Sequence, residues 1–201
     1  MDNSKNNIKQ IAYRLFQKHG YNNVSLKDIC AAAQITKTTF YYHFNSKEDL
    51  LKDFIEQPLP MSLDEVNILL GMDSRWEQLW YLSYITSAKI MEAGPTIYKQ
   101  VFQSNIESNK GTFDFLNNRA SNVFVPIIKK GQETGEFKNK TPVETLIQMA
   151  WTMYIGLLAQ WCISNGEFNL AEREMQLFQN IYQVDEKYLF TIEAFIKKYS
   201  L

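Results

Sequence analysis

The chain has 201 residues and a net charge of −1, with 45% hydrophobic and 21% charged residues, which is typical of a soluble globular protein. No apolar run approaches the roughly 20 residues that a membrane span needs, and the polar N-terminal residues show no apolar signal core, so we expect a cytoplasmic protein with no membrane partner. The two cysteines, Cys30 and Cys162, exclude a disulfide framework and lack the spacing of metal ligands.

The charge is unevenly distributed along the chain. Residues 1–50 contain seven basic and four acidic residues, a balance of +3, whereas the remaining 151 residues contain 14 basic and 18 acidic ones, a balance of −4. A basic N-terminal part beside an acidic body favours nucleic acid as the partner of the N-terminal part.

The N-terminal part predicts one long helix and two short ones. The first helix has an apolar stripe with helical spacing, formed by Ile8, Ile11, Ala12, Leu15 and Phe16. Gly20 supplies a left-handed end to it. Ser25 and Asp28 form a capping box at the start of a short second helix. Thr36 caps a third helix, which runs through His43.

From residue 46 onward the sequence predicts further helices. Ser46 and Asp49 cap a connecting helix over residues 46–57, and a short helix follows over residues 62–70. Boundary signals then delimit the remaining helices: Ser74 with Glu77, Gly94 with Pro95, Gly135, Thr141 as an N-cap before Pro142 at the first helical position, Asn169 with Glu172, and a last amphipathic helix from Asp185 to Tyr199. The chain is therefore expected to be all-α, with nine or ten helices.

The two short helices carry the clearest functional signal. Joined by a tight turn and packed on a longer helix, they have the layout of a helix-turn-helix module, whose second short helix enters the DNA major groove. Phe40 and Phe44 are expected to face inward. The threonines and lysine of residues 36–39 suit base edges and phosphates, and the rings of residues 41–43 suit phosphates and sugars. The alternative is that these polar residues form only a solvated face.

The segment VSLKDICAAAQITKTTFYYHFNSKEDLL resembles the N-terminal DNA-binding signature of the tetracycline-repressor family of bacterial transcription regulators, over about residues 8–55. The resemblance implies an all-helical homodimer, with a DNA-binding domain over residues 1–47 and a helical ligand-binding and dimerisation domain over residues 48–201. It also implies base, backbone and phosphate contacts to double-stranded DNA by Ser25, Thr36, Lys37, Thr38, Thr39, Tyr41, Tyr42, His43 and Lys47.

Two residues depart from the family pattern, because Gln34 and Thr38 occupy positions that are often glycine. Gln34 has to adopt a left-handed turn, at a cost of about 1 kcal/mol. Thr38 prevents a close approach of the backbone but offers a methyl group and a hydroxyl. Both changes bear on the operator sequence rather than on DNA binding itself.

The helix over residues 143–164 is apolar around most of its circumference, so it must be buried on more than one side. We expect one side to face its own domain and another, including Leu158, to face a partner subunit. The family resemblance implies the same dimer, built from the last two main helices as a four-helix bundle. A dimer also places two recognition helices on the half-sites of a palindromic operator, roughly 34–36 Å apart.

The C-terminal part is rich in large aromatic side chains, which favours a ligand pocket, although each single residue is also explained as ordinary core. The residues expected nearest to the pocket are Tyr84, Phe102, Trp151 and Tyr154. Because these helices carry no concentrated charge, an apolar or aromatic effector is indicated.

An enzyme is the contrasting class. Both histidines, His19 and His43, lie in the N-terminal part, and the sequence has no Ser/His/Asp set, glycine-rich phosphate loop or paired Cys/His motif. We therefore expect no catalytic residues, cofactor or metal. Two alternatives stay open: a nucleoid-type DNA-binding protein without a ligand, and a regulator that binds DNA only with its ligand. The main hypothesis is a repressor that a small-molecule effector of unknown identity releases from its operator.

Overall fold

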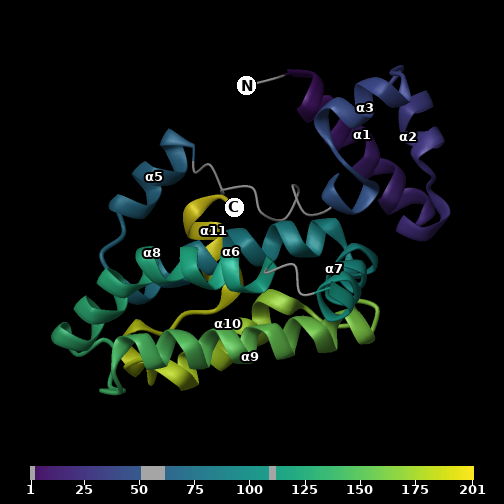
Figure 1. Cartoon of the computed structure of the whole chain (residues 1–201). Helices are drawn as coiled ribbons and strands as arrows, with labels where there is room; N and C mark the ends of the chain where they lie inside the picture. Colours follow the sequence, from purple (N-terminus) through teal and green to yellow (C-terminus); the bar gives the residue numbers. More distant parts are fainter. Residues whose placement is uncertain (1–2, 51–61, 109–111) are drawn as a thin grey trace. The chain divides into compact units, whose positions relative to one another are not determined.

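The computed structural model describes residues 3–50, 62–108 and 112–201, and within these ranges the chain is helical (Figure 1). The helices are α1 (Asn3–His19), α2 (Leu26–Ala32), α3 (Lys37–His43), α5 (Leu63–Leu70), α6 (Arg75–Ala93), α7 (Pro95–Ser108), α8 (Thr112–Thr134), α9 (Val143–Ile163), α10 (Leu170–Tyr182) and α11 (Ile192–Tyr199), with short 3-10 helices η1 (Tyr21–Asn23) and η2 (Glu186–Tyr188). The prediction of an all-α fold is confirmed.

The chain forms two compact units. The first comprises the described parts of residues 1–58 and 90–112, and the second those of residues 59–89 and 113–201. Helix α6 therefore contributes to both units, and α7 belongs with the N-terminal helices. The predicted domain boundary after residue 47 stays a prediction.

In the first unit, α1 is the helix on which the others pack. It contacts α2, η1 and α7, and α2 contacts α3. The predicted stripe faces this core, because Ile8, Ala12 and Phe16 are at most 1% exposed. Phe40 and Phe44 of the α3 segment are buried as well, which confirms their inward direction.

The helix ends of the first unit follow the local sequence signals. The Ser25 hydroxyl accepts a hydrogen bond from the Asp28 backbone N–H, and the Asp28 carboxylate accepts one from the Ser25 N–H, so the predicted capping box is present. Thr36 caps α3 by accepting from the Thr39 N–H at 3.1 Å. Gln34 has a φ of 53°, as the turn position requires. Ser46 caps the next helix by accepting from the Asp49 N–H, while residues 51–57 of the predicted connecting helix lie outside the described residues.

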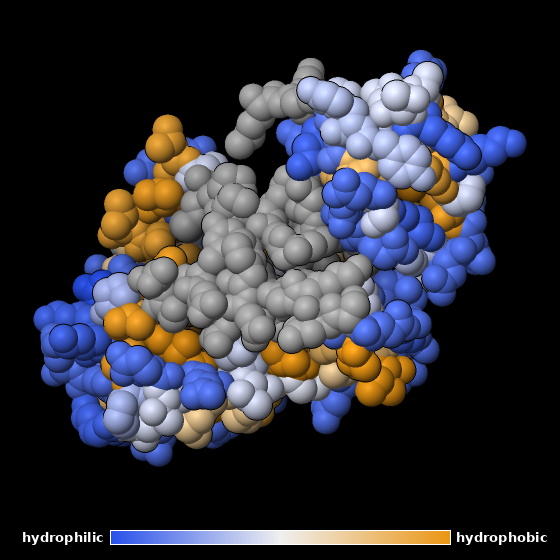
Figure 2. All heavy atoms as spheres, viewed as in Figure 1, coloured by the Kyte–Doolittle hydropathy of each residue, from blue (hydrophilic) through white to orange (hydrophobic). Residues whose placement is uncertain are grey.

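In the second unit, α9 and α10 lie side by side (Figure 1). The buried residues of α9 are Leu146, Ile147, Ala150, Tyr154, Leu157, Leu158, Trp161 and Cys162. A second cluster is aromatic: Trp80 and Tyr84 of α6 lie with their ring centroids 6.5 and 6.1 Å from that of Phe195 on α11. Helix α5 has no buried residue, and its surface is apolar (Figure 2).

The direction of Leu158 corrects one expectation. Its side chain is 2% exposed within the subunit, so it belongs to the core of the second unit and is not free to form a dimer interface. The exposed apolar side chains of α9 lie on another face and include Met149, Met153 and Ile163. The sequence could not separate the two faces, because α9 is apolar around most of its circumference.

Helix α9 also corrects the expectation that no apolar run is long enough to span a membrane. By length and composition alone, Val143–Ile163 passes that test. In the structure, however, much of the helix is buried against its own unit, as in the core helix of a soluble protein. The test therefore gives no more than weak support for a membrane span.

Three predicted helix ends differ in detail. Helix α9 begins at Val143 with Pro142 as its N-cap, so Thr141 is not the capping residue. The segment from Asp185 to Tyr199 is not one helix, because η2 ends at Tyr188 and α11 starts anew after its cap, Thr191.

The third difference concerns the start of α6. Ser74 accepts hydrogen bonds from the N–H groups of Trp76 and Glu77, as an N-cap does. The carboxylate that completes this end is Glu136, which follows α8, and not the predicted Glu77. Glu77 instead pairs with Lys198 of α11.

Candidate nucleic-acid interface and sensor core

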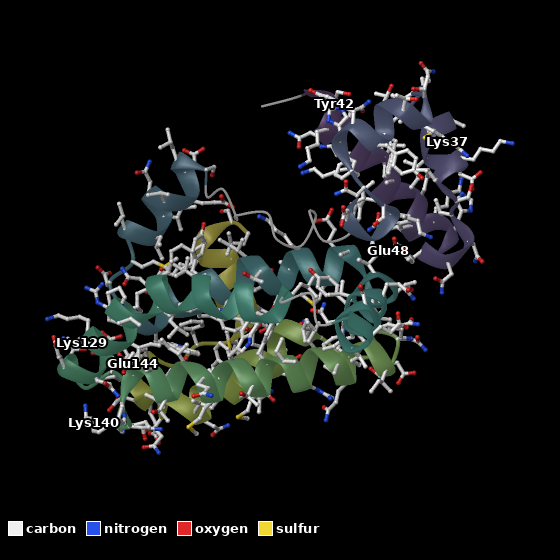
Figure 3. The ribbon with its side chains drawn as sticks, viewed as in Figure 1. Lys37, Tyr42, Glu48, Lys129, Lys140 and Glu144 are labelled. Carbon is white, nitrogen blue, oxygen red and sulfur yellow. The ribbon has the colours of Figure 1, made fainter. Side chains whose placement is uncertain are left out.

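Helix α3 presents a polar and aromatic face to solvent. Lys37 and Thr38 are exposed, Tyr41 is 54% exposed and Tyr42 is 83% exposed. Lys37 and Tyr42 point outward from the helices of the first unit (Figure 3). Since Phe40 on the same helix is fully buried, the inner face anchors α3 while the outer face is free to contact a partner. An exposed helix with hydroxyls, an ammonium and phenols suits both base edges and phosphates.

Four other predicted DNA contacts interact with neighbouring residues of the first unit. The Thr36 and Thr39 hydroxyl oxygens are 2.9 Å apart and share a hydrogen bond. The Ser25 hydroxyl donates to the Asp28 carboxylate at 2.6 Å, and the hydrogen bonds from Ser25 lower the pKa of Asp28. The half-buried His43 ring lies edge-on to the Tyr42 ring, with centroids 4.9 Å apart. Ser25 thus lies at the start of α2, Thr36 and Thr39 at the start of α3, and His43 at the end of α3.

Lys47 has an internal role that its sequence position does not reveal. Its Nζ donates to the carbonyl oxygens of Tyr21 at 2.9 Å and Val24 at 3.0 Å, and lies 3.9 Å from the centroid of the Tyr21 ring. Burial lowers the pKa of Lys47. The Tyr21 hydroxyl donates to Glu48 at 3.0 Å. Residues 47 and 48 thus tie the helix that starts after Ser46 to the segment before α2, and the phosphate contact of Lys47 stays a prediction.

The four predicted pocket residues do not form one group. Phe102 lies on α7 in the first unit, whereas Tyr84, Trp151 and Tyr154 lie in the second. Within the second unit, the rings of Trp151 and Tyr154 are 5.9 Å apart, and Tyr84 packs toward Trp80 instead. Their role in ligand binding stays a prediction.

Glu174 is a buried residue of the second unit that the sequence interpretation missed. It lies on α10 with 3% of its surface exposed, and its carboxylate accepts a hydrogen bond from the Ser87 hydroxyl of α6. The Tyr154 hydroxyl of α9 lies 3.4 Å from the same Ser87 oxygen. Burial raises the pKa of Glu174 to about 8. A sequence signal existed, because Glu174 interrupts the apolar stripe between Leu170 and Phe178 at helical spacing.

The chain is similar to known bacterial transcription regulators. The family model "Bacterial regulatory proteins, tetR family" matches residues 10–54. The uncharacterized HTH-type transcriptional regulator YfiR of Bacillus subtilis is 22% identical over 196 residues, which cover 92% of this chain and 95% of that protein. The HTH-type transcriptional repressor KstR2 of Rhodococcus jostii is 25% identical over 142 residues, which cover 68% and 69%. The crystal structure of Thermus thermophilus FadR, a TetR-family repressor in complex with lauroyl-CoA, has a TM-score of 0.66 at 20% identity and covers 92% of this chain and 95% of that one.

Residues 10–54 carry the DNA-binding domain of the tetR family of bacterial regulatory proteins. With this domain and its similarity to curated transcriptional regulators, the chain is a DNA-binding transcriptional regulator. The predictions of family, fold and regulatory function are therefore confirmed. Within the described residues, no three His, Cys, Asp or Glu side chains are grouped so as to hold a metal ion.

Proposed function

We propose that this tetR-family protein is a cytoplasmic repressor that occupies a palindromic operator as a homodimer and leaves it when a small molecule binds the second unit. The observation that carries the DNA-binding part is the outer face of α3, where Lys37, Thr38, Tyr41 and Tyr42 are exposed around a buried Phe40. KstR2 is a repressor and FadR was crystallised with lauroyl-CoA, which supports the same mode of action here.

The contacts to DNA divide by chemistry. Lys37 and Thr38 stand at the exposed start of α3 and are proposed to contact base edges, whereas the phenols of Tyr41 and Tyr42 contact phosphates. Thr36, Thr39 and Ser25 hold the helix starts and add backbone contacts, with His43 at the end of α3. Lys47 acts first through the hydrogen bonds that tie the helix after Ser46 to the segment before α2, and its ammonium adds to the attraction for phosphate.

The dimer interface is proposed on the outward face of α9 and α10. Met149 is 44% exposed, Met153 is 39% exposed and Ile163 is 78% exposed, so this face offers apolar area to a second copy of the chain. A Cβ added at Gly156 would meet no atom of the subunit within 4 Å, so the glycine leaves room for close approach of a partner helix. Two recognition helices in one dimer then bind two half-sites of an operator.

Selection of genomic DNA fragments with the purified dimer tests the proposal. We expect a palindromic site with half-sites about one helical turn apart, near 34–36 Å. Lys37→Ala should change the preferred bases within each half-site, whereas Lys129→Ala, at an exposed position on α8, should leave the selected sequence unchanged. Recovery of DNA without a common sequence would contradict a specific repressor and favour a nucleoid-type role.

A further inference from the structure

The second unit buries two glutamates in different ways. The Glu136 carboxylate accepts hydrogen bonds from the Ser74 hydroxyl at 3.0 Å, the Arg75 N–H at 2.6 Å and the Trp76 N–H at 3.2 Å. It therefore sits at the positive end of α6, where a negative charge is stabilised by the free N–H groups and by the helix dipole. This arrangement shows how the fold satisfies a carboxylate whose role is structural.

Glu174 lacks such partners. Its one hydrogen bond among the described residues comes from the neutral Ser87 hydroxyl, and no described lysine, arginine or histidine forms an ion pair with it. A carboxylate taken out of water without a cation is costly, and a leucine or methionine here would continue the apolar stripe of α10 without that cost. Packing alone therefore does not explain the acid.

The side chains around Glu174 belong to three helices and include two tyrosines. Ser87 of α6 is fully buried, Tyr154 of α9 is 6% exposed and Tyr182 of α10 is 3% exposed. Burial and the charge of Glu174 both raise the pKa of Tyr182, so its phenol is neutral near pH 7. The Trp151 ring adjoins Tyr154 and is itself half-buried, so this aromatic pair extends from the acid toward the surface.

Helix α6 carries further unused hydrogen-bonding capacity. The indole N–H groups of Trp76 and Trp80 and the hydroxyl of Tyr81 are buried without a hydrogen-bond partner. Buried polar groups in folded proteins are nearly always satisfied, so each exception calls for a physical explanation. The unpaired acid on α10 and these donors on α6 are therefore two separate places in the second unit where hydrogen-bonding capacity is unused.

We propose that Glu174, together with Ser87 and Tyr154, binds the amino group of a cationic small molecule whose remainder is apolar or aromatic, and that amines of this kind are the effector class. The proposal rests on the proposed function, because it names the class of ligand that makes the repressor leave its operator. A cation beside Glu174 supplies the missing ion pair, and the faces of Tyr154 and Trp151 attract positive charge. On binding, the amine enters as an ammonium ion and the protonated carboxyl releases its proton to solvent.

Three probes of equal length test the charge preference: 4-phenylbutylamine, 4-phenylbutan-1-ol and 4-phenylbutanoate. Titrated calorimetrically into the full-length dimer, the amine should bind at least about tenfold more tightly than the alcohol, which corresponds to about 1.4 kcal/mol, and the acid should bind most weakly. Glu174→Gln should remove the preference for the amine and leave the affinity for the alcohol within about twofold. Glu172→Gln, which removes an exposed charge from the same helix, should leave all three affinities unchanged.

The released proton gives a second measurement that needs no variant. In two buffers with different enthalpies of ionisation, the heat of amine binding to the unsubstituted protein near pH 7 should differ by an amount that corresponds to release of up to about one proton per site. Binding of the alcohol should show no such difference. Amine binding without proton release would contradict the participation of Glu174, even if Glu174→Gln failed to fold.

The outcomes separate this proposal from the proposed function. Equal amine affinity in the unsubstituted and Glu174→Gln proteins, or no amine binding at millimolar concentration, would overturn the proposal while a repressor released by another compound remained intact. Glu174-dependent amine binding that leaves operator affinity unchanged would instead support the binding site and overturn amine-induced release. Amine binding that lowers operator affinity in the unsubstituted protein, but not in Glu174→Gln, supports both.

Discussion

The helix-turn-helix segment and the second unit place polar and apolar groups in opposite ways. In residues 3–50, apolar side chains such as Phe40 face inward, and the hydroxyls at helix starts bond to neighbouring backbone. In the second unit, Met153 of α9 faces outward while the carboxyl of Glu174 faces inward. The first arrangement leaves the polar surface that we propose for DNA, and the second leaves the apolar surface and the buried carboxyl that we propose for a second subunit and an amine.

The largest effect is expected from charges placed on the two faces of α9. Leu158→Glu puts a carboxylate into the core and should destabilise the fold by about 4 kcal/mol or more, as loss of a cooperative thermal transition will show. Met153→Glu puts the same charge on the outward face, so it should weaken the dimer at least about tenfold and leave helix content unchanged. Sedimentation and circular dichroism measure the two effects. A folded dimer of Met153→Glu would remove this face from the interface.

The next effect is a dependence of stability on pH that arises from Glu174. Its pKa is about 8 in the folded chain against a usual 4.5. Between these values the unfolded chain has lost the proton that the folded chain retains, so the free energy of unfolding falls as pH rises, by at most about 1.4 kcal/mol per pH unit. Glu174→Gln is neutral in both states and should lack this decline. Urea unfolding of both proteins across the window tests it, and parallel curves would show that burial does not hold the proton.

The other buried acid should respond differently to the same substitution. Glu136→Gln weakens the hydrogen bonds that this carboxylate accepts from Ser74, Arg75 and Trp76, and it should lower the free energy of unfolding by about 1.5–3 kcal/mol near pH 7. Glu133→Gln nearby should change it by less than about 0.5 kcal/mol, since its pair with Lys130 is exposed. Denaturant titration gives both values. If Glu136→Gln leaves the free energy of unfolding unchanged, the hydrogen bonds of Glu136 do not stabilise the fold as proposed.

The smallest effect tests the capped helix starts of the first unit. Ser25→Ala removes the hydroxyl that accepts from the Asp28 N–H and should cost about 1 kcal/mol, whereas Ser25→Gly should cost only a few tenths. The same urea titration resolves the two variants. Equal losses for alanine and glycine would mean that the cap does not support α2.

The contrast between the two regions also explains what the sequence could predict. Capping pairs such as Ser25 with Asp28 act over three residues, so their pattern alone identifies the helix starts, and the apolar spacing on α1 identifies its inner face. Glu136 caps a helix some 60 residues earlier in the chain, and Lys47 bonds to carbonyls of residues 21 and 24. Such partners depend on the fold, so no local pattern gives them.

The interior of the second unit was harder to predict for a related reason. Aromatic content predicted an interior of large rings, but Tyr84 and Trp151 have different neighbours, and Phe102 belongs to the other unit. Glu174 broke an apolar stripe in the sequence, which was the one local sign of its burial. Its partner Ser87 lies 87 residues earlier, and only the folded chain brings the two together.

The most direct measurement of the central claim is operator affinity after removal of the outer side chains of α3. The triple variant Lys37→Ala, Thr38→Ala and Thr39→Ala should lose at least about 100-fold in affinity for the selected operator, since the proposed base contacts of Lys37 and Thr38 contribute about 1–3 kcal/mol each and Thr39 adds a backbone contact. Its affinity for unrelated DNA should fall far less, and its helix content should be unchanged. If the triple variant binds the operator as tightly as the unsubstituted protein, α3 is not the recognition helix and the account of DNA binding is wrong.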